Sequence, residues 1–174
     1  MTQAPIEISE RTAKDLFCEA FGAQATGVAI ITAQGSDGEP GGLTISSLSS
    51  VSADPQIVAF SFKDRTGSAA RIVDAGSFLI HLVSAENVDL ASKFAISKYP
   101  KFEDTSTWDC LPTGEPLLHG IGRVLRVVPL SQIQAGEAIV FTAEVTDFIR
   151  HKLNTTPVVY HSRKFHVLGE HSAL

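Results

Sequence analysis

Residues 43–62 read LTISSLSSVSADPQIVAFSF, and this stretch predicts two β-strands with no helix between them. The first strand covers 43–52 and ends at Asp54-Pro55, and the second covers 56–62. Other apolar or β-branched segments predict further strands, at 26–33, at 77–83, near 121–129, near 138–149 and at 157–168. The turn-forming residues QGSDGEPGG predict a hairpin loop after the strand at 26–33.

Three short helices are predicted beside these strands. The first covers 9–22, where Ser9 or Thr12 can cap the helix and Thr12 and Asp15 fit a capping box. Its expected buried stripe consists of Leu16, Phe17, Ala20 and Phe21. The other helices cover 68–75 and 84–95, and the polar stretch 96–115 is expected to be irregular. Six or seven strands without regular βαβ alternation predict a mainly β fold, an antiparallel β-barrel with flanking helices, rather than a doubly wound sheet.

The composition is that of one ordinary globular domain. The chain has 174 residues, 44% hydrophobic and 19% charged, which predicts a single domain over 1–174 with its core at about 12–168. A formal net charge of −5 leaves no surplus of Lys and Arg for general nucleic-acid binding. Neither a signal peptide nor an apolar run of about 18 residues is present, so we expect no membrane association and a cytoplasmic location. Cys18 and Cys110 lack zinc-ligand spacing, so no metal site is expected.

The strand predicted at 43–52 is unusually rich in hydroxyl groups. It carries Thr44, Ser46, Ser47, Ser49, Ser50 and Ser52, although serine is a poor strand former. Small hydroxyl side chains suit a place where a ligand approaches the backbone closely and meets hydrogen-bond donors. The alternative is a solvated edge strand whose serines bind nothing.

A second hydroxyl-rich segment follows the strand at 56–62. Here Lys63 and Arg65 precede Thr66, Gly67 and Ser68 at the predicted start of a helix, where unpaired N–H groups attract anions. The alternative is ordinary N-capping by Ser68, which requires no ligand. One phosphate-bearing ligand would explain both hydroxyl-rich segments together.

These segments, in this order, resemble the flavin reductase-like family of FMN-binding split barrels, which includes the reductase components of two-component flavin monooxygenases. The matching pieces are FGAQATGVAIITA (21–33), GGLTISSLSSVSADP (41–55), RTGSAARI (65–72), AGSFLIHLVSAENVDLASKFA (75–95), PKF (100–102), GEPLLHGIGRV (114–124) and TPVVYHSRKFHVL (156–168). The resemblance implies a six-stranded antiparallel split barrel, a homodimer with FMN or FAD at the subunit interface, and NADH or NADPH as co-substrate. It implies an NAD(P)H:flavin reductase that supplies reduced flavin to a partner monooxygenase.

The resemblance also assigns the flavin site residue by residue. Thr44, Ile45, Ser46, Ser47 and Ser50 would line the edge of the flavin ring and the ribityl chain. Thr66 and Ser68 would meet the phosphate, and Lys101, which precedes Phe102, would also reach the flavin. No catalytic acid, base or nucleophile is expected, because the hydride chemistry belongs to the flavin.

One segment departs from the family pattern. Members commonly carry Gly-Asp-His followed by Gly-x-Val, whereas residues 135–145 read AGEAIVFTAEV, with Glu137 at the acidic position, Ala138 at the histidine position and Ala143 at the second glycine. Because that histidine is associated with the nicotinamide and flavin environment, Ala138 implies weak use of NAD(P)H. The alternative function is a flavin carrier, sensor or storage protein without reductase activity. A different ligand such as haem has no axial-ligand signature in the sequence.

Overall fold

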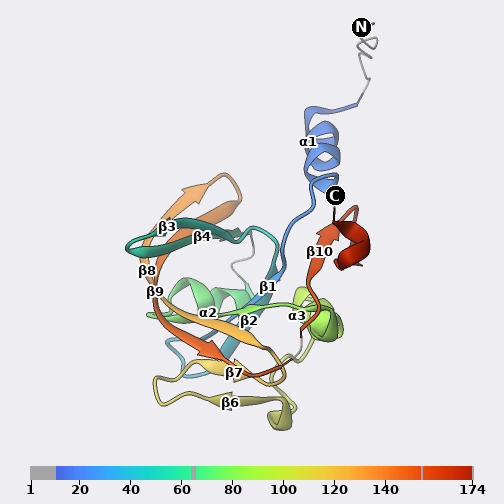
Figure 1. Ribbon diagram of the computed structural model, residues 1–174. Helices are drawn as coiled ribbons and strands as arrows, with labels where there is room; N and C mark the ends of the chain where they lie inside the picture. The colour runs from blue at the N-terminus through green and yellow to red at the C-terminus, as the bar shows by residue number, and fades with distance from the viewer. Residues whose placement is uncertain (1–10, 64–65, 154, 174) are drawn as a thin grey trace, which may run out of the picture.

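The main feature of the fold is a seven-stranded antiparallel sheet that curls into a split barrel (Figure 1). The computed structural model describes residues 11–63, 66–153 and 155–173. The strand order is β2-β1-β5-β8-β9-β4-β3. The strands are β1 (Ala29–Gln34), β2 (Pro40–Ile45), β3 (Ser49–Ala53), β4 (Gln56–Phe62), β5 (Phe78–Leu82), β8 (Arg123–Ala135) and β9 (Ala138–Arg150). The mainly β, antiparallel fold expected from the sequence is therefore confirmed, with one strand more in the sheet than the six implied.

The extra strand arises because the prediction of one continuous strand over 43–52 is wrong. The chain bends at residues 46–48 and divides the segment into β2 and β3, which become the two edge strands of the sheet. At the bend the Ser47 hydroxyl accepts a hydrogen bond from the Ser61 N–H (2.9 Å) and donates one to the Ser61 carbonyl (2.7 Å). A side chain thus replaces strand pairing where the chain turns, and β2 comes to lie against β4.

Two small hairpins and four short helical segments accompany the sheet in the described part of the chain, besides the first helix. β6 (Trp108–Cys110) pairs with β7 (Pro116–Leu118), and β10 (Val158–His161) pairs with β11 (Lys164–Val167). The strand predicted at 157–168 is divided by a tight turn at Ser162 and Arg163, whose φ angles are 49° and 62°. Two of the helical segments are α-helices that each follow a 3₁₀ turn: α2 (Ala70–Val73) follows Gly67–Ala69, and α3 (Val88–Ala95) follows Ala85–Asn87. The other two are the 3₁₀ turns Thr105–Thr107 and Glu170–Ser172.

Aromatic rings fill the interior of the barrel. Phe60 and Phe141 stack with their ring centroids 5.2 Å apart, and the edge of Phe78 meets both rings. A second apolar cluster lies under α3 and is built around Phe94 and Ile121. The alternating burial of β4 matches its sequence QIVAFSF, in which every second residue faces the interior of the barrel.

The first helix, α1 (Ala13–Gly22), ends at the predicted residue but begins at Ala13 rather than at residue 9, and it does not bury its apolar stripe. Thr12 and Asp15 form the expected capping box, whereas Ser9 lies outside the described residues. Phe17 and Phe21 are 63% and 59% exposed, and Leu16, Cys18 and Ala20 are exposed as well. Figure 1 shows α1 standing away from the sheet, so no described part of this chain covers the stripe. None of the helices in the described part of the chain is long and apolar enough to cross a membrane.

Two buried polar side chains fasten the β6–β7 hairpin to the sheet. The ring of His81, on β5, is fully buried; it donates through Nδ1 to the Ile30 carbonyl (3.2 Å) and accepts at Nε2 from the Leu118 N–H (3.1 Å). The carboxylate of Glu115, just before β7, accepts hydrogen bonds from the Ser77 and Thr113 hydroxyls and from Arg126 Nε (2.8 Å). Sequence analysis did not identify either residue.

Candidate functional site

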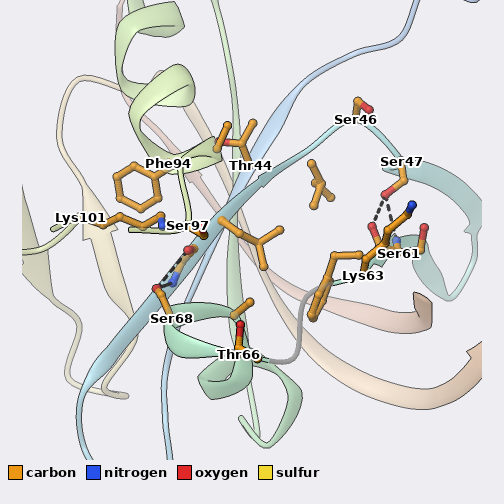
Figure 2. A pocket seen from close by; sticks show the side chains of 16 residues that line it. Thr44, Ser46, Ser47, Ser61, Lys63, Thr66, Ser68, Phe94, Ser97 and Lys101 are labelled. Carbon is orange, nitrogen blue, oxygen red and sulfur yellow. Dashed lines mark hydrogen bonds between the residues drawn. The ribbon is translucent and has the colours of Figure 1, made fainter. Parts of the chain in front are cut away.

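A cavity of about 340 Å³ opens at the split in the barrel, between the end of β2 and the end of β4. Its walls come from residues 42–47 and 61–63, from Thr66, Ser68 and Ala69, and from the end of α3 with the loop that follows it (Figure 2). Seven of the eight predicted site residues line this one cavity: Thr44, Ile45, Ser46, Ser47, Thr66, Ser68 and Lys101. The fold therefore brings together side chains from β2, from the turn before α2 and from the loop after α3.

The eighth predicted residue, Ser50, does not line the cavity. It lies on β3, an edge strand, and its side chain is exposed, as is that of Ser49. The hydroxyl-rich segment thus divides at the bend: residues 44–47 face the cavity, whereas β3 fits the alternative of a solvated edge strand.

Three of the predicted hydroxyl groups also hold the cavity walls in place. Thr44 Oγ1 donates to the Ala91 carbonyl on α3 (2.6 Å), and Ser47 joins the bend to β4. Ser68 Oγ accepts from the Gly42 N–H (2.7 Å) and donates to the Gly42 carbonyl (3.1 Å), which is visible in Figure 2. The alternative of N-capping by Ser68 is therefore wrong, because its side chain braces β2 instead.

Close packing behind β2 explains its two glycines. A Cβ on Gly42 would lie 2.8 Å from Phe94 Cε1 and 3.1 Å from Phe102 Cζ. A Cβ on Gly41 would lie 2.5 Å from the Ser68 carbonyl oxygen. Only residues without a side chain let this strand approach both α3 and the turn before α2 so closely.

The charges of the cavity suit an anionic ligand. Among the described lining residues two are lysines and none is a carboxylate. Lys101 is only 9% exposed, and its Nζ donates to the Ile96 carbonyl (2.8 Å). Lys63 stands at the opposite end, exposed, with its Nζ 3.9 Å from the Glu137 carboxylate. Arg65, part of the predicted anion site, lies outside the described residues.

Several lining residues were not identified by sequence analysis. Ser61, Phe94 and Ser97 border the cavity, although Phe94 looks like an ordinary apolar residue of an amphipathic helix. Ser61 alternates with buried residues on β4, so its strand position indicates only that it faces away from the core. Of these, Ser61 meets the bend at residues 46–48 through its hydrogen bonds with Ser47, which the local sequence does not reveal.

The segment that departs from the family pattern forms a hairpin tip. Gly136 has a φ angle of 60° in the turn between β8 and β9, and Ala138 is the first residue of β9. No histidine is among the described residues that line the cavity. His119 instead contacts Asp109 (2.8 Å), whose hydrogen bond raises the pKa of the imidazole above its ordinary value, and His161 and His166 lie on the β10–β11 hairpin.

Comparison with known proteins gives consistent matches. The sequence model described as "Flavin reductase like domain" matches residues 21–169. An NADH:FMN oxidoreductase of Rhodococcus qingshengii is 34% identical over 143 residues, covering 80% of this chain and 74% of that protein. The reductase component of a flavin-dependent trigonelline monooxygenase of Acinetobacter baylyi is 28% identical over 130 residues, covering 75% of this chain and 42% of that protein.

Solved structures agree with these matches. The crystal structure of a flavin reductase domain protein from Arthrobacter sp. FB24 superposes with a TM-score of 0.82 at 28% identity, covering 90% of this chain and 96% of that chain. An NADH:FAD oxidoreductase from Streptomyces globisporus C-1027 also reaches a TM-score of 0.82, at 24% identity, covering 97% of this chain and 100% of that chain. The second likeness shows the shared fold alone.

Proposed function

Since the chain belongs to the flavin reductase-like family, we propose that it works as a single-domain, homodimeric NAD(P)H:flavin reductase. The observation that carries this proposal is the cavity at the split of the barrel, which combines hydroxyl groups, an apolar wall and two lysines without a carboxylate among its described lining residues. Such a lining suits a ligand with a flat ring, a polyhydroxyl chain and a phosphate, which describes a flavin nucleotide.

The proposal gives each part of the cavity a role. The backbone and side chains of residues 44–47 would seat the ring edge and the ribityl chain, and Thr66, Ser68 and Lys101 would hold the phosphate. The bound flavin would accept a hydride from a nicotinamide. The protein's own part is to bind and orient both molecules, since no described side chain of the cavity is an evident acid, base or nucleophile.

The proposal extends to a protein partner and a location. The relative named as the reductase component of a flavin-dependent monooxygenase supports a partner monooxygenase that receives the reduced flavin. The proposed location is the cytoplasm. The thiols of Cys18 and Cys110 are exposed and not joined in a disulfide, which suits this reducing compartment.

A second candidate function is flavin binding without reductase activity. Ala138 favours it, because the family resemblance implies a histidine at this position and no histidine is among the described residues that line the cavity. This candidate shares the flavin site with the first and differs from it only in hydride transfer.

The placement of the phosphate predicts that Thr66→Val weakens the binding of FMN more than that of riboflavin. A hydrogen bond to a charged group contributes about 1.5–3 kcal/mol, so FMN affinity is expected to fall roughly tenfold or more. Ser68 is left unchanged in this test because its side chain braces β2. Titrations followed by flavin fluorescence measure both affinities, with Thr105→Val, which lies outside the cavity, as the matched control. Equal weakening of both ligands would place the phosphate elsewhere.

The homodimer is supported by the exposed stripe on α1. Phe17 and Phe21 form a ring pair with centroids 4.6 Å apart and no cover from the described part of this chain. A second copy of the chain would bury them, as apolar surface of this kind is usually covered in obligate dimers.

Light scattering is therefore expected to give about 37 kDa, twice the 18.6 kDa of the chain. Phe17→Glu combined with Phe21→Glu should give the single-chain mass, because burying two carboxylates in an apolar interface is unfavourable. Glu19→Gln, on the opposite face of the helix, should leave the dimer intact. A wild-type monomer that binds flavin stoichiometrically would contradict a site shared between subunits.

The departure at Ala138 predicts a high Michaelis constant for NADH and NADPH. Loss of one good polar contact costs roughly 1–2 kcal/mol, which corresponds to about five- to thirtyfold. Glu137→Asp combined with Ala138→His is expected to raise kcat/KM for NADH by this factor, whereas Glu137→Asp alone should leave it unchanged. Steady-state oxidation of NADH with flavin present measures the effect. A wild type that is already fast, and indifferent to the double substitution, would show that position 138 does not matter.

A further inference from the structure

A second cavity, of about 580 Å³, continues from the first. The two cavities share Ser68, Ser97 and Lys101 as lining residues. Figure 2 shows these three side chains gathered at one side of the first cavity, away from Ser47 and Lys63. This is also the side at which the proposed function places the phosphate. A ligand that fills the first cavity with its phosphate at this side therefore leaves the second cavity open beyond the phosphate.

The lining of the second cavity combines three kinds of side chain. It has cations in Arg71 and Lys98 besides Lys101, carboxylates in Glu39 and Glu103, and aromatic rings in Tyr99, Phe102 and Trp108. A site for a simple anion would need only the cations. Cations for phosphate, carboxylates for ribose hydroxyls and rings for stacking a base together suit a nucleoside phosphate.

Hydrogen bonds hold this lining in shape without a ligand. Arg71 Nε contacts the Asp37 carboxylate (3.0 Å) and its Nη1 donates to the Pro40 carbonyl (3.3 Å). The Tyr99 N–H and Lys101 Nζ both donate to the Ile96 carbonyl, at 3.2 and 2.8 Å, so the loop that carries Tyr99 and Lys101 is closed on itself. Less ordering is then required when a ligand binds.

We propose that the second cavity holds the adenosine monophosphate half of FAD, so that this chain prefers FAD to FMN. The inference rests on the proposed function and deepens it. FAD is FMN extended at its phosphate by adenosine monophosphate, and the buried ammonium of Lys101 lies where the two cavities meet, which is where the pyrophosphate would lie. The names of the similar proteins leave the flavin open, because a relative is an NADH:FMN oxidoreductase and a protein of the same fold is an NADH:FAD oxidoreductase.

Tyr99 is the residue that tests the inference. It lines the second cavity and is not among the described residues that line the first. It lies outside both apolar clusters, whereas Trp108 and Phe102 pack against the core with ring centroids 5.4 Å apart. Tyr99→Ala therefore removes a stacking surface with little risk to folding, and Tyr99→Phe keeps the ring as the matched control.

The dissociation constants of riboflavin, FMN and FAD are measured by titration of the full-length protein, wild type and both variants. We expect FAD to bind the wild type about five- to a hundredfold more tightly than FMN, the range that one stacked base contributes. Tyr99→Ala should remove most of this difference and leave FMN and riboflavin affinities unchanged, and Tyr99→Phe should preserve it.

Equal affinity for FMN and FAD in the wild type would overturn the inference and leave the proposed flavin site standing. Absence of binding by all three flavins would overturn both. A third outcome would also overturn the inference: if Tyr99→Ala raised the KM for NADH with FMN bound and left FAD affinity unchanged, the cavity would hold the adenosine of the nicotinamide nucleotide.

Discussion

Glu115→Ala is expected to lower the free energy of unfolding by about 3 kcal/mol, because it removes one partner of a buried ion pair. Glu115 is 1% exposed, and its carboxylate collects hydrogen bonds from Ser77, Thr113 and Arg126. Burial alone would raise the pKa of Glu115, but the two hydroxyl donors and the Arg126 guanidinium outweigh it and hold the pKa below its ordinary value. The carboxylate is therefore charged at neutral pH. Its removal takes away the acceptor of both hydroxyls and leaves Arg126 with only its contacts to Thr146 and Asp147.

Urea unfolding of the wild type and the variant at neutral pH measures this loss. Glu170→Ala serves as the control, since Glu170 is an exposed glutamate near the end of the chain and its loss should change stability by less than about 0.5 kcal/mol. If Glu115→Ala cost no more than the control, the network would not be what fastens the β6–β7 hairpin to the sheet.

We expect the folded protein to lose stability in mild acid because of the buried side chain of His81. Burial lowers its pKa from 6.5 to about 4, against the smaller opposing effect of its hydrogen bond to the Ile30 carbonyl. The unfolded chain therefore binds this proton more readily than the folded one. The stabilisation is complete above the unfolded pKa and is lost as the pH falls from 6.5 toward about 4. From neutral pH to about pH 4.5 the free energy of unfolding should fall by roughly 2–3 kcal/mol from this residue alone.

Other titrating groups act outside this range or in the opposite sense. Hydrogen bonds from Ser84 and Thr156 lower the pKa of Glu86 to about 2, so its effect is lost between 4.5 and that value. The raised pKa of His119 gives a contribution that is present in acid and lost as the pH rises. The non-titrating His81→Gln variant should show a flatter pH profile of urea unfolding than the wild type, whereas His166→Gln, at an exposed position, should keep the wild-type profile. Parallel profiles for the wild type and His81→Gln would show that His81 does not cause the loss.

The sequence patterns correctly predicted those parts of the fold that depend on the local alternation or periodicity of apolar residues. The bounds of β4 agree with the prediction because QIVAFSF alternates between core and outer face. The bend between β2 and β3 could not be predicted in this way, since it depends on the bonds between Ser47 and Ser61, which lie on different elements. The periodicity of α1 revealed an apolar face and not what covers that face.

The sequence predicted those residues of the candidate site that lie in short, recognisable segments. The hydroxyl-rich pieces around Thr44 and Thr66 were identified from composition and resemblance, and the fold brings them to one cavity. Ser50 was placed there too, because a single strand over 43–52 gave no reason to separate it from its neighbours. The role of His81 could not be predicted from its own apolar strand, because the groups that hold its ring come from β1 and β7.

Anaerobic reduction of the bound flavin tests the central proposal most directly. The protein is mixed with flavin in the absence of oxygen, NADH or NADPH is added, and the visible absorption of the flavin is followed. A flavin reductase should bleach this absorption with one nicotinamide oxidised per flavin, and admission of oxygen should restore it. A protein that binds flavin but leaves it oxidised with both nicotinamides would contradict the reductase assignment and establish a flavin-binding protein instead.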